Sequence, residues 1–157
     1  MNGPRARGAA GELYAGAGLH CRLVNALLVI GLVAAVLAAC LHVLIFWMEA
    51  IAWEGPLARK TFGGTPEEAR PHAFYAFNQG FYNLFLAVEA LAGVALMALS
   101  SGAWHTAGAA LALYGVGSML AAALVLALKS PAHRPAALKQ GAFPVIAVVF
   151  LVLGLLH

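Results

Sequence analysis

Four long apolar runs constrain this chain more than any other feature of its sequence. The runs cover Leu23–Met48, Leu84–Leu99, Ala103–Leu128 and Ala136–Leu156, and residues Phe74–Asn83 extend the second run on its N-terminal side. An α-helix needs about 20 apolar residues to cross the roughly 30 Å hydrocarbon core of a bilayer. The strands of a membrane barrel would instead alternate apolar and polar residues. The runs therefore predict four transmembrane helices.

The composition indicates the same class of protein. Hydrophobic residues make up 63% of the 157 residues and charged residues 10%, whereas a soluble domain is roughly 45–50% apolar and about 25% charged. These values exclude a soluble globule, a disordered chain and a disulfide scaffold. No basic run is interleaved with aromatic residues, so no nucleic-acid binding is expected. The sequence also lacks metal-ligand spacing and cofactor motifs, so neither a metal nor a cofactor is expected.

The links between the runs predict an all-α, four-helix transmembrane bundle with up-down antiparallel helices. The turn Ser100-Ser101-Gly102 is too short to join anything but an antiparallel pair. Within the link 54–70, Thr65-Pro66-Glu67-Glu68 has the pattern of a helix N-cap followed by proline and acidic residues, which predicts a short surface helix. We expect a flexible tail over 1–22 and one transmembrane domain over 23–157, with helices at about 23–53, 71–99, 103–128 and 136–156.

The basic residues predict how the bundle is oriented. Three of them accompany the N-terminus, and six lie in or beside the two long links, namely Arg59, Lys60, Arg70, Lys129, Arg134 and Lys139. Cytoplasmic loops carry the excess of Lys and Arg. We therefore expect a multi-pass protein of the bacterial inner membrane, with both termini outside and the links 54–70 and 129–135 in the cytoplasm.

A second membrane signal overlaps the first run. Leu37-Ala38-Ala39-Cys40 fits the lipobox of bacterial lipoproteins. Such a signal normally gives way to polar sequence, whereas residues 41–48 stay apolar, which favours a chance match. The sequence leaves open whether this lipobox is used.

Polar side chains inside the spans are the candidates for function, because a charged group in hydrocarbon costs roughly 2.5–3.5 kcal/mol. At 100° per residue, His42, Glu49 and Trp53 share one stripe of the first helix. On the second helix the same spacing aligns Tyr75, Asn78, Tyr82 and Glu89, and the further candidates Gln79 and Asn83 flank that stripe. Such residues usually face the bundle interior and pair with one another.

Matching depths in antiparallel helices place this polar band between the first two helices. If Trp53 and His72 are level, His42 lies beside Asn83 and Glu49 beside Ala76. The candidates for catalysis are His42, Glu49 and Glu89, and those for substrate binding are Trp53, Tyr75, Asn78, Gln79, Tyr82 and Asn83. Tyr114 and Ser118 are the expected partners of Glu89. The alternative is that the amides only hydrogen-bond neighbouring helices and that Trp53 anchors the chain at the interface.

Three short strings connect the chain to a known family. They are E-x-x-x-W from Glu49, R-K-x-F from Arg59 and N-Q-G-x-Y-N from Asn78. With these strings the chain resembles, over about residues 24–157, a bacterial family of small four-span membrane proteins of unknown function. The resemblance implies the fold and the membrane location, and it implies no activity.

Three functions fit these features. The first is an intramembrane site that binds a small lipophilic molecule, or transforms it by acid–base chemistry such as isomerisation, cyclisation or hydration. The second is a proton-coupled small-molecule exporter acting as a homodimer. The third is a non-catalytic accessory protein. A homodimer would form through the Gly/Ala face of the third helix, at Gly108, Gly115 and Gly117. Whether the protein is an enzyme stays open.

Overall fold

The computed structural model describes residues 4–157, and side chains from Gly16 onward. Its helices are α1 (Pro4–Phe46), α2 (Pro56–Phe62), α3 (Pro66–Ala69), α4 (Ala73–Leu99), α5 (Gly102–Lys129) and α6 (Arg134–Leu156). A π-helix, Trp47–Ile51, continues α1, and short 3₁₀ turns over Arg70–His72 and Pro131–His133 precede α4 and α6. The described residues contain no strand, which confirms the all-α prediction.

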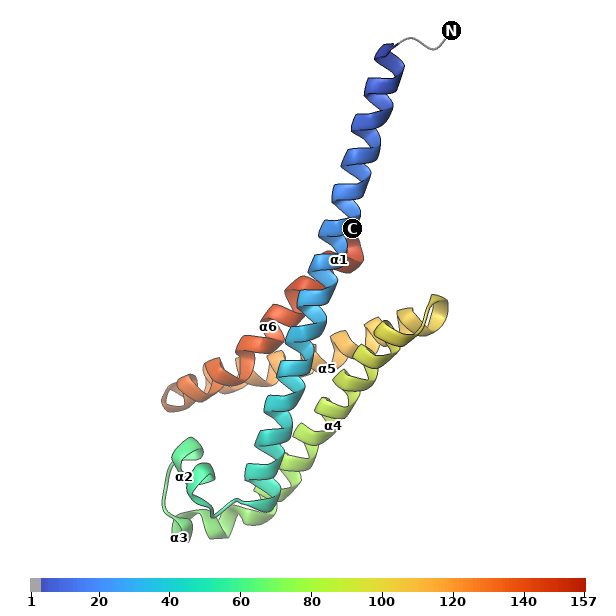
Figure 1. Cartoon of the computed structure of the whole chain (residues 1–157). Coiled ribbons are helices and arrows are strands. Elements are labelled where there is room, and N and C mark those ends of the chain that lie inside the picture. The colour runs from blue at the N-terminus through green and yellow to red at the C-terminus, as the bar shows by residue number, and fades with distance from the viewer. Residues whose placement is uncertain (1–3) are drawn as a thin grey trace.

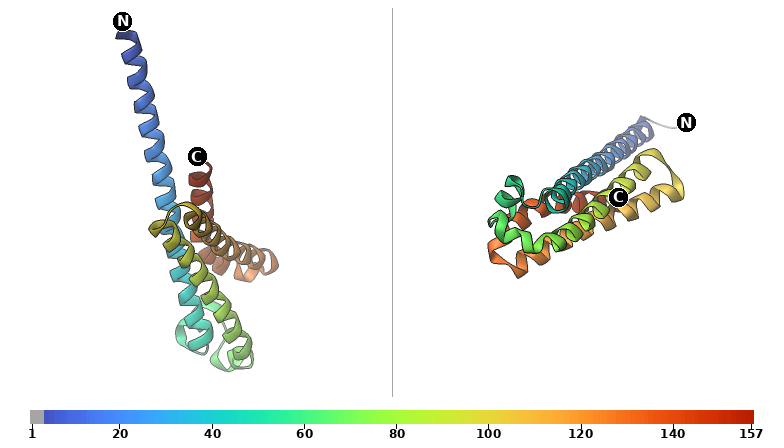
Figure 2. Two further views of the ribbon diagram at one scale, coloured as in Figure 1. Left: turned by 90° about the vertical axis from the view of Figure 1, so that its right-hand side faces the viewer. Right: turned by 90° about the horizontal axis from the view of Figure 1, so that it is seen from below.

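The four long helices form a ring. Helix α1 packs against α4 and α6, and α5 packs against the same two helices, while α1 and α5 scarcely touch. Consecutive long helices run antiparallel, so the bundle has the predicted up-down order (Figure 1). Helices α4 and α5 meet at their connecting turn and splay apart away from it (Figure 1, Figure 2). The chain ends and this turn lie on one side of the bundle, and α2 and α3 lie on the other.

Four helices are long and apolar enough to cross a membrane, as predicted. The candidate spans are Gly16–Ile51, Pro66–Leu99, Gly102–Lys129 and Pro131–Leu156. Large apolar side chains such as Val29, Phe85, Leu124 and Val149 lie exposed on the outer surface. In a bilayer that surface faces lipid chains, so its exposure carries no hydrophobic cost.

The predicted start of the first helix, at residue 23, is wrong. Helix α1 begins at Pro4, and its first turns project beyond the C-terminal end of α6 (Figure 1). Proline suits the first position of a helix, and no further proline interrupts the sequence before Pro56. Residues 1–3 of the expected tail lie outside the described residues.

Small residues set the spacing of the helices. The central cluster consists mostly of alanines, among them Ala35 and Ala38 of α1 and Ala87 and Ala90 of α4. A Cβ added at Gly108 would lie 2.8 Å from the Gly93 carbonyl oxygen, and one at Gly115 would lie 3.0 Å from the Ala90 nitrogen. Such close approach is the usual way in which membrane helices pack. Two of the three glycines expected to form a homodimer face therefore lie inside the α4–α5 contact.

Adding one methyl group at Gly93 tests this packing. Its Cβ would collide with the backbone of Ala112, whereas Gly117 on α5 has nothing within 4 Å of an added Cβ. We expect Gly93→Ala to lower the free energy of unfolding in detergent by about 1–3 kcal/mol, as overpacking does, and Gly117→Ala to leave it unchanged. Equal stability of the two variants would contradict the α4–α5 contact.

Candidate functional site

A hydrogen bond joins the predicted polar residues of the first two spans. Glu49 lies in the π-helix at the end of α1, and its Oε2 accepts a hydrogen bond of 2.8 Å from Nδ2 of Asn83 on α4. The same Nδ2 also donates to the Gln79 carbonyl at 3.1 Å. Asn83 is only 5% exposed. A π-helix is rare and frequently marks a functional site.

Gly80 makes this hydrogen bond geometrically accessible. A Cβ at Gly80 would lie 3.0 Å from the backbone nitrogen of Ala50 and 3.2 Å from Cβ of Glu49. The absence of a side chain therefore lets α4 approach the end of α1 closely. At this spacing the short side chain of Asn83 reaches the Glu49 carboxylate.

The predicted register of the two helices is wrong by five to seven residues, between one and two helical turns. It placed Glu49 beside Ala76 and His42 beside Asn83, but Glu49 bonds Asn83. The register assumed that Trp53 and His72 are level. The contact between Gly80 and Ala50 shows that α4 extends further toward α2 and α3 than that assumption allowed.

His42 is completely buried and separate from the Glu49–Asn83 pair. Its Nδ1 lies 2.9 Å from the Ala38 carbonyl one turn back in α1. A carbonyl oxygen only accepts, so Nδ1 carries the hydrogen. Nε2 is buried and has no hydrogen-bond partner in the part of the chain that the structure describes. Any molecule acted on by this imidazole would need the bundle to open.

The other candidates on α4 do not converge on this pair. Tyr75 is 72% exposed and Tyr82 57% exposed, and Asn78 and Gln79 are exposed as well. Glu89 is half-buried and forms no hydrogen bond with any described residue, and Tyr114, one of its expected partners, is 68% exposed.

Trp53 belongs to a second cluster, in the segment 52–72 that covers one end of the bundle, here called the cap. Its indole nitrogen donates a hydrogen bond of 2.8 Å to the Ala69 carbonyl. The guanidinium carbon of Arg59 lies 4.2 Å from the centroid of the Trp53 ring, within the range of a cation–π interaction. The ring of Phe62 lies 5.6 Å from that of Trp53, centroid to centroid.

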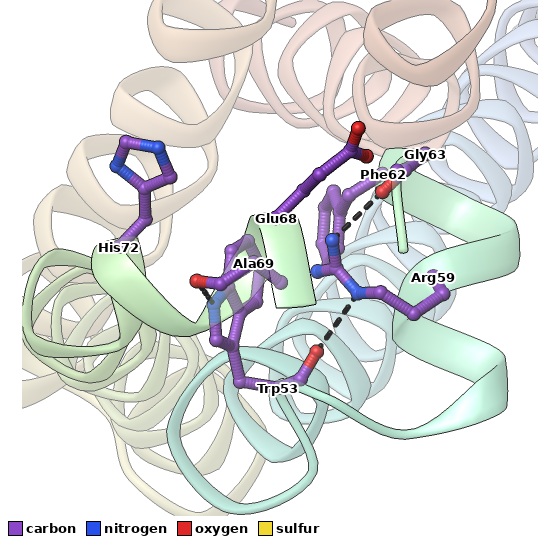
Figure 3. Close-up of a pocket in the computed structure, with 8 residues that line it drawn as sticks. Trp53, Arg59, Phe62, Gly63, Glu68, Ala69 and His72 are labelled. Atoms are coloured by element: carbon purple, nitrogen blue, oxygen red, sulfur yellow. Dashed lines mark hydrogen bonds between the residues drawn. The ribbon is translucent and has the colours of Figure 1, made fainter. Parts of the chain in front are cut away.

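Arg59 is held in place by two backbone carbonyls (Figure 3). Its Nε donates to the Trp53 carbonyl at 3.0 Å, and Nη1 donates to the Gly63 carbonyl at 2.7 Å. The third nitrogen, Nη2, is buried and has no hydrogen-bond partner among the described residues. Arg59 and Phe62 were not among the predicted site residues, although the string R-K-x-F contained both.

Local geometry keeps the cap in this shape. Gly63 and Gly64 have φ values of 84° and 75°, which favour glycine. Thr65 and Glu68 form a reciprocal N-cap, which confirms the predicted helix start. The Glu68 backbone N–H donates to Oγ1 of Thr65 at 3.3 Å, and the Thr65 backbone N–H donates to Oε2 of Glu68 at 2.9 Å. On the surface, Arg70 pairs with Glu54 at 2.9 Å, and this hydrogen bond lowers the pKa of the Glu54 carboxyl.

Two hollows adjoin the cap. One, here called the cap cavity, has a volume of about 390 Å³ and is lined by Trp53, Arg59, Phe62, Glu68, His72 and the turn at Gly63. The other, called the apolar groove, has a volume of about 210 Å³ and lies between α1, α2 and α6. Its walls are mainly apolar, with Thr61, Lys139 and Gln140 as the polar members. Phe62 lines both hollows.

Two asparagines on α4 test the helix contact. Asn83→Ala removes the hydrogen bond to Glu49, so we expect it to lower the free energy of unfolding by about 0.6–1.7 kcal/mol, as for other hydrogen bonds between membrane helices. Asn78→Ala is the matched control, because Asn78 is exposed, and should change the stability little. A chemical unfolding titration in detergent measures both, and equal losses would argue against a specific role of Asn83.

The family comparison matches the region that carries both clusters. The family described as "Protein of unknown function (DUF1304)" matches residues 36–152, a range that includes Glu49, Asn83 and the whole cap. No curated protein and no solved structure matches the chain. The chain therefore belongs to the DUF1304 family of proteins of unknown function.

Proposed function

We propose that this membrane protein binds a small amphiphilic molecule at the capped end of its bundle. The polar part of the molecule would occupy the cap cavity and its apolar part the apolar groove. The observation that carries the proposal is that Phe62 lines both hollows, one with charged side chains and one with mainly apolar walls. A site of this kind combines apolar walls with a few polar groups that orient the ligand.

The location of the two hollows supports an amphiphile rather than a water-soluble ligand. The cap cavity lies at the ends of the first two candidate spans, on the residues between them and on the first turns of the second span. The groove is bordered by Leu41, Leu44 and Ile45, further inside the first span. A ligand that fills both therefore extends from the polar cap into the level of the membrane-spanning helices.

His42 and the Glu49–Asn83 pair lie in the helices next to the cap, and they line neither hollow. Their hydrogen bonds fix the end of α1 from which the cap continues. The proposal therefore includes binding and no chemical step. A proton-coupled exporter would use a membrane-embedded carboxyl such as that of Glu89. Glu89 likewise lines neither hollow, so no comparable geometry favours export.

Tryptophan fluorescence tests the proposal. Trp53 lines the cap cavity, whereas Trp104 is exposed near the α4–α5 turn, at the other end of the bundle. Dodecyl probes with a brominated chain are added to the protein in dodecyl maltoside micelles. In a variant that retains only Trp53, we expect the quenching of tryptophan fluorescence to saturate as the probe concentration rises. The probes carry a phosphate, a trimethylammonium or a maltoside head.

A variant retaining only Trp104 is the control for partition into the micelle. Its quenching should rise without saturation as the brominated chains enter the micelle. The proposal fails if none of the three head groups gives Trp53 a saturable component that Trp104 lacks.

We also propose that the cap faces the cytoplasm, in the bacterial inner membrane. Six of the nine basic residues lie in or beside the two links on the cap side, as the positive-inside rule requires. In a cysteine-free background, Lys60→Cys on exposed α2 should resist a membrane-impermeant maleimide in intact spheroplasts, and Ser101→Cys should react. The reverse pattern would place the cap outside.

A further inference from the structure

We propose that the cap cavity binds a single anionic group, a phosphate or a carboxylate, and that Arg59 recognises it. This inference rests on the proposed function, because it names the polar part of the amphiphile. It goes further by assigning the chemistry of the head group to one side chain.

Arg59 forms no salt bridge with any residue whose side chain the structure describes. Both hydrogen-bond acceptors of its guanidinium, at Trp53 and Gly63, are neutral backbone carbonyls. Among residues 16–157, whose side chains the structure describes, the one ion pair joins Arg70 to Glu54 instead. Arg59 is itself half-buried, so water screens its charge less than that of an exposed arginine.

The guanidinium of Arg59 also has one nitrogen, Nη2, whose hydrogens are not used in a hydrogen bond with the described residues. Nη2 of Arg59 is buried and has no partner in the described chain, although it carries two N–H groups. Leaving a buried charged donor unsatisfied is costly, and such groups call for an explanation, for instance an ion or water that occupies the site. Stacking on the Trp53 ring stabilises the charge, but it supplies no oxygen to accept these hydrogens.

The guanidinium of Arg59 is preorganised at the wall of the cap cavity, because the two carbonyls and the Trp53 ring fix it on three sides (Figure 3). Since Nη2 is buried, a ligand reaches it by a small movement of the lining side chains. A planar guanidinium held in this way suits the oxygen atoms of phosphate and carboxylate groups. Little side-chain entropy would then be lost on binding.

The remaining charges around the cavity set the number of anionic groups. Glu68 lines the cavity with a carboxylate, of which Oε2 is already used by the backbone nitrogen of Thr65. This carboxylate repels a second negative charge close to the first. The exposed imidazole of His72 lies in the same lining and adds a donor. The cavity therefore suits one anionic group better than several.

The experiment compares head groups on one chain length. In dodecyl maltoside micelles at constant ionic strength, the brominated dodecyl phosphate should bind the variant retaining only Trp53 about 10-fold or more tightly than the brominated trimethylammonium probe. Equal affinity for the three heads would overturn the anion site and leave amphiphile binding intact. Absence of any saturable quenching would overturn the proposed function itself.

Substitutions of Arg59 and of the neighbouring Lys60 test which cation binds the phosphate head group. Arg59→Gln should weaken binding of the phosphate probe about 10-fold or more, Arg59→Lys should weaken it less because the charge stays, and Lys60→Gln should leave it unchanged. Lys60 is the matched control because it is exposed on the same helix and carries the same charge. Unchanged affinity of a folded Arg59→Gln variant, or equal losses at both positions, would overturn the role of Arg59.

Inorganic phosphate distinguishes the source of the anion. If it displaces the brominated phosphate probe and restores Trp53 emission, the site also accepts the free anion. If emission is not restored, the apolar chain is needed and the ligand is an amphiphile. Both outcomes support the anion site, and the head-group comparison in the unsubstituted cavity remains decisive even if Arg59→Gln does not fold.

Discussion

The hydrogen bond between Glu49 and Asn83 is the interaction on which the capped end of the bundle depends. It joins α1 to α4 at the place where α1 changes into a π-helix, and it forms because Gly80 has no side chain to keep the two backbones apart. A carboxylate and an amide within candidate membrane spans would each be costly alone, and together they satisfy one another. The bond thereby fixes the point from which the chain leaves the bundle as the cap.

The cap is organised around the guanidinium of Arg59. Trp53 lies two residues after the end of the π-helix and connects the helix contact to the cap, because its indole N–H donates to the Ala69 carbonyl and its ring stacks on Arg59. Two carbonyls orient the guanidinium and leave its charge unpaired beside a cavity. The three sequence strings that indicated the family lie in these two clusters. This arrangement connects a helix contact between two candidate spans to the cavity in the cap.

The sequence predicted the fold well, because helix spans depend on local composition. The four apolar runs gave the spans, the turn before Gly102 gave their antiparallel order, and Thr65 gave the start of a cap helix. The site was predicted only in part. Helical periodicity placed Tyr75, Asn78, Tyr82 and Glu89 on one stripe, but whether a stripe faces a neighbour depends on how α4 and α5 splay, which no local pattern encodes. Arg59 was missed because its role comes from tertiary contacts to Trp53 and Gly63.

A double-mutant cycle between Glu49 and Asn83 tests the central contact most directly. The free energy of unfolding in detergent would be measured for the unsubstituted protein, Glu49→Ala, Asn83→Ala and the double variant. We predict a coupling energy of about 0.6–1.7 kcal/mol, the range for hydrogen bonds between membrane helices. Additive losses, with a coupling energy near zero, would contradict the account, because Glu49 and Asn83 would then not depend on one another.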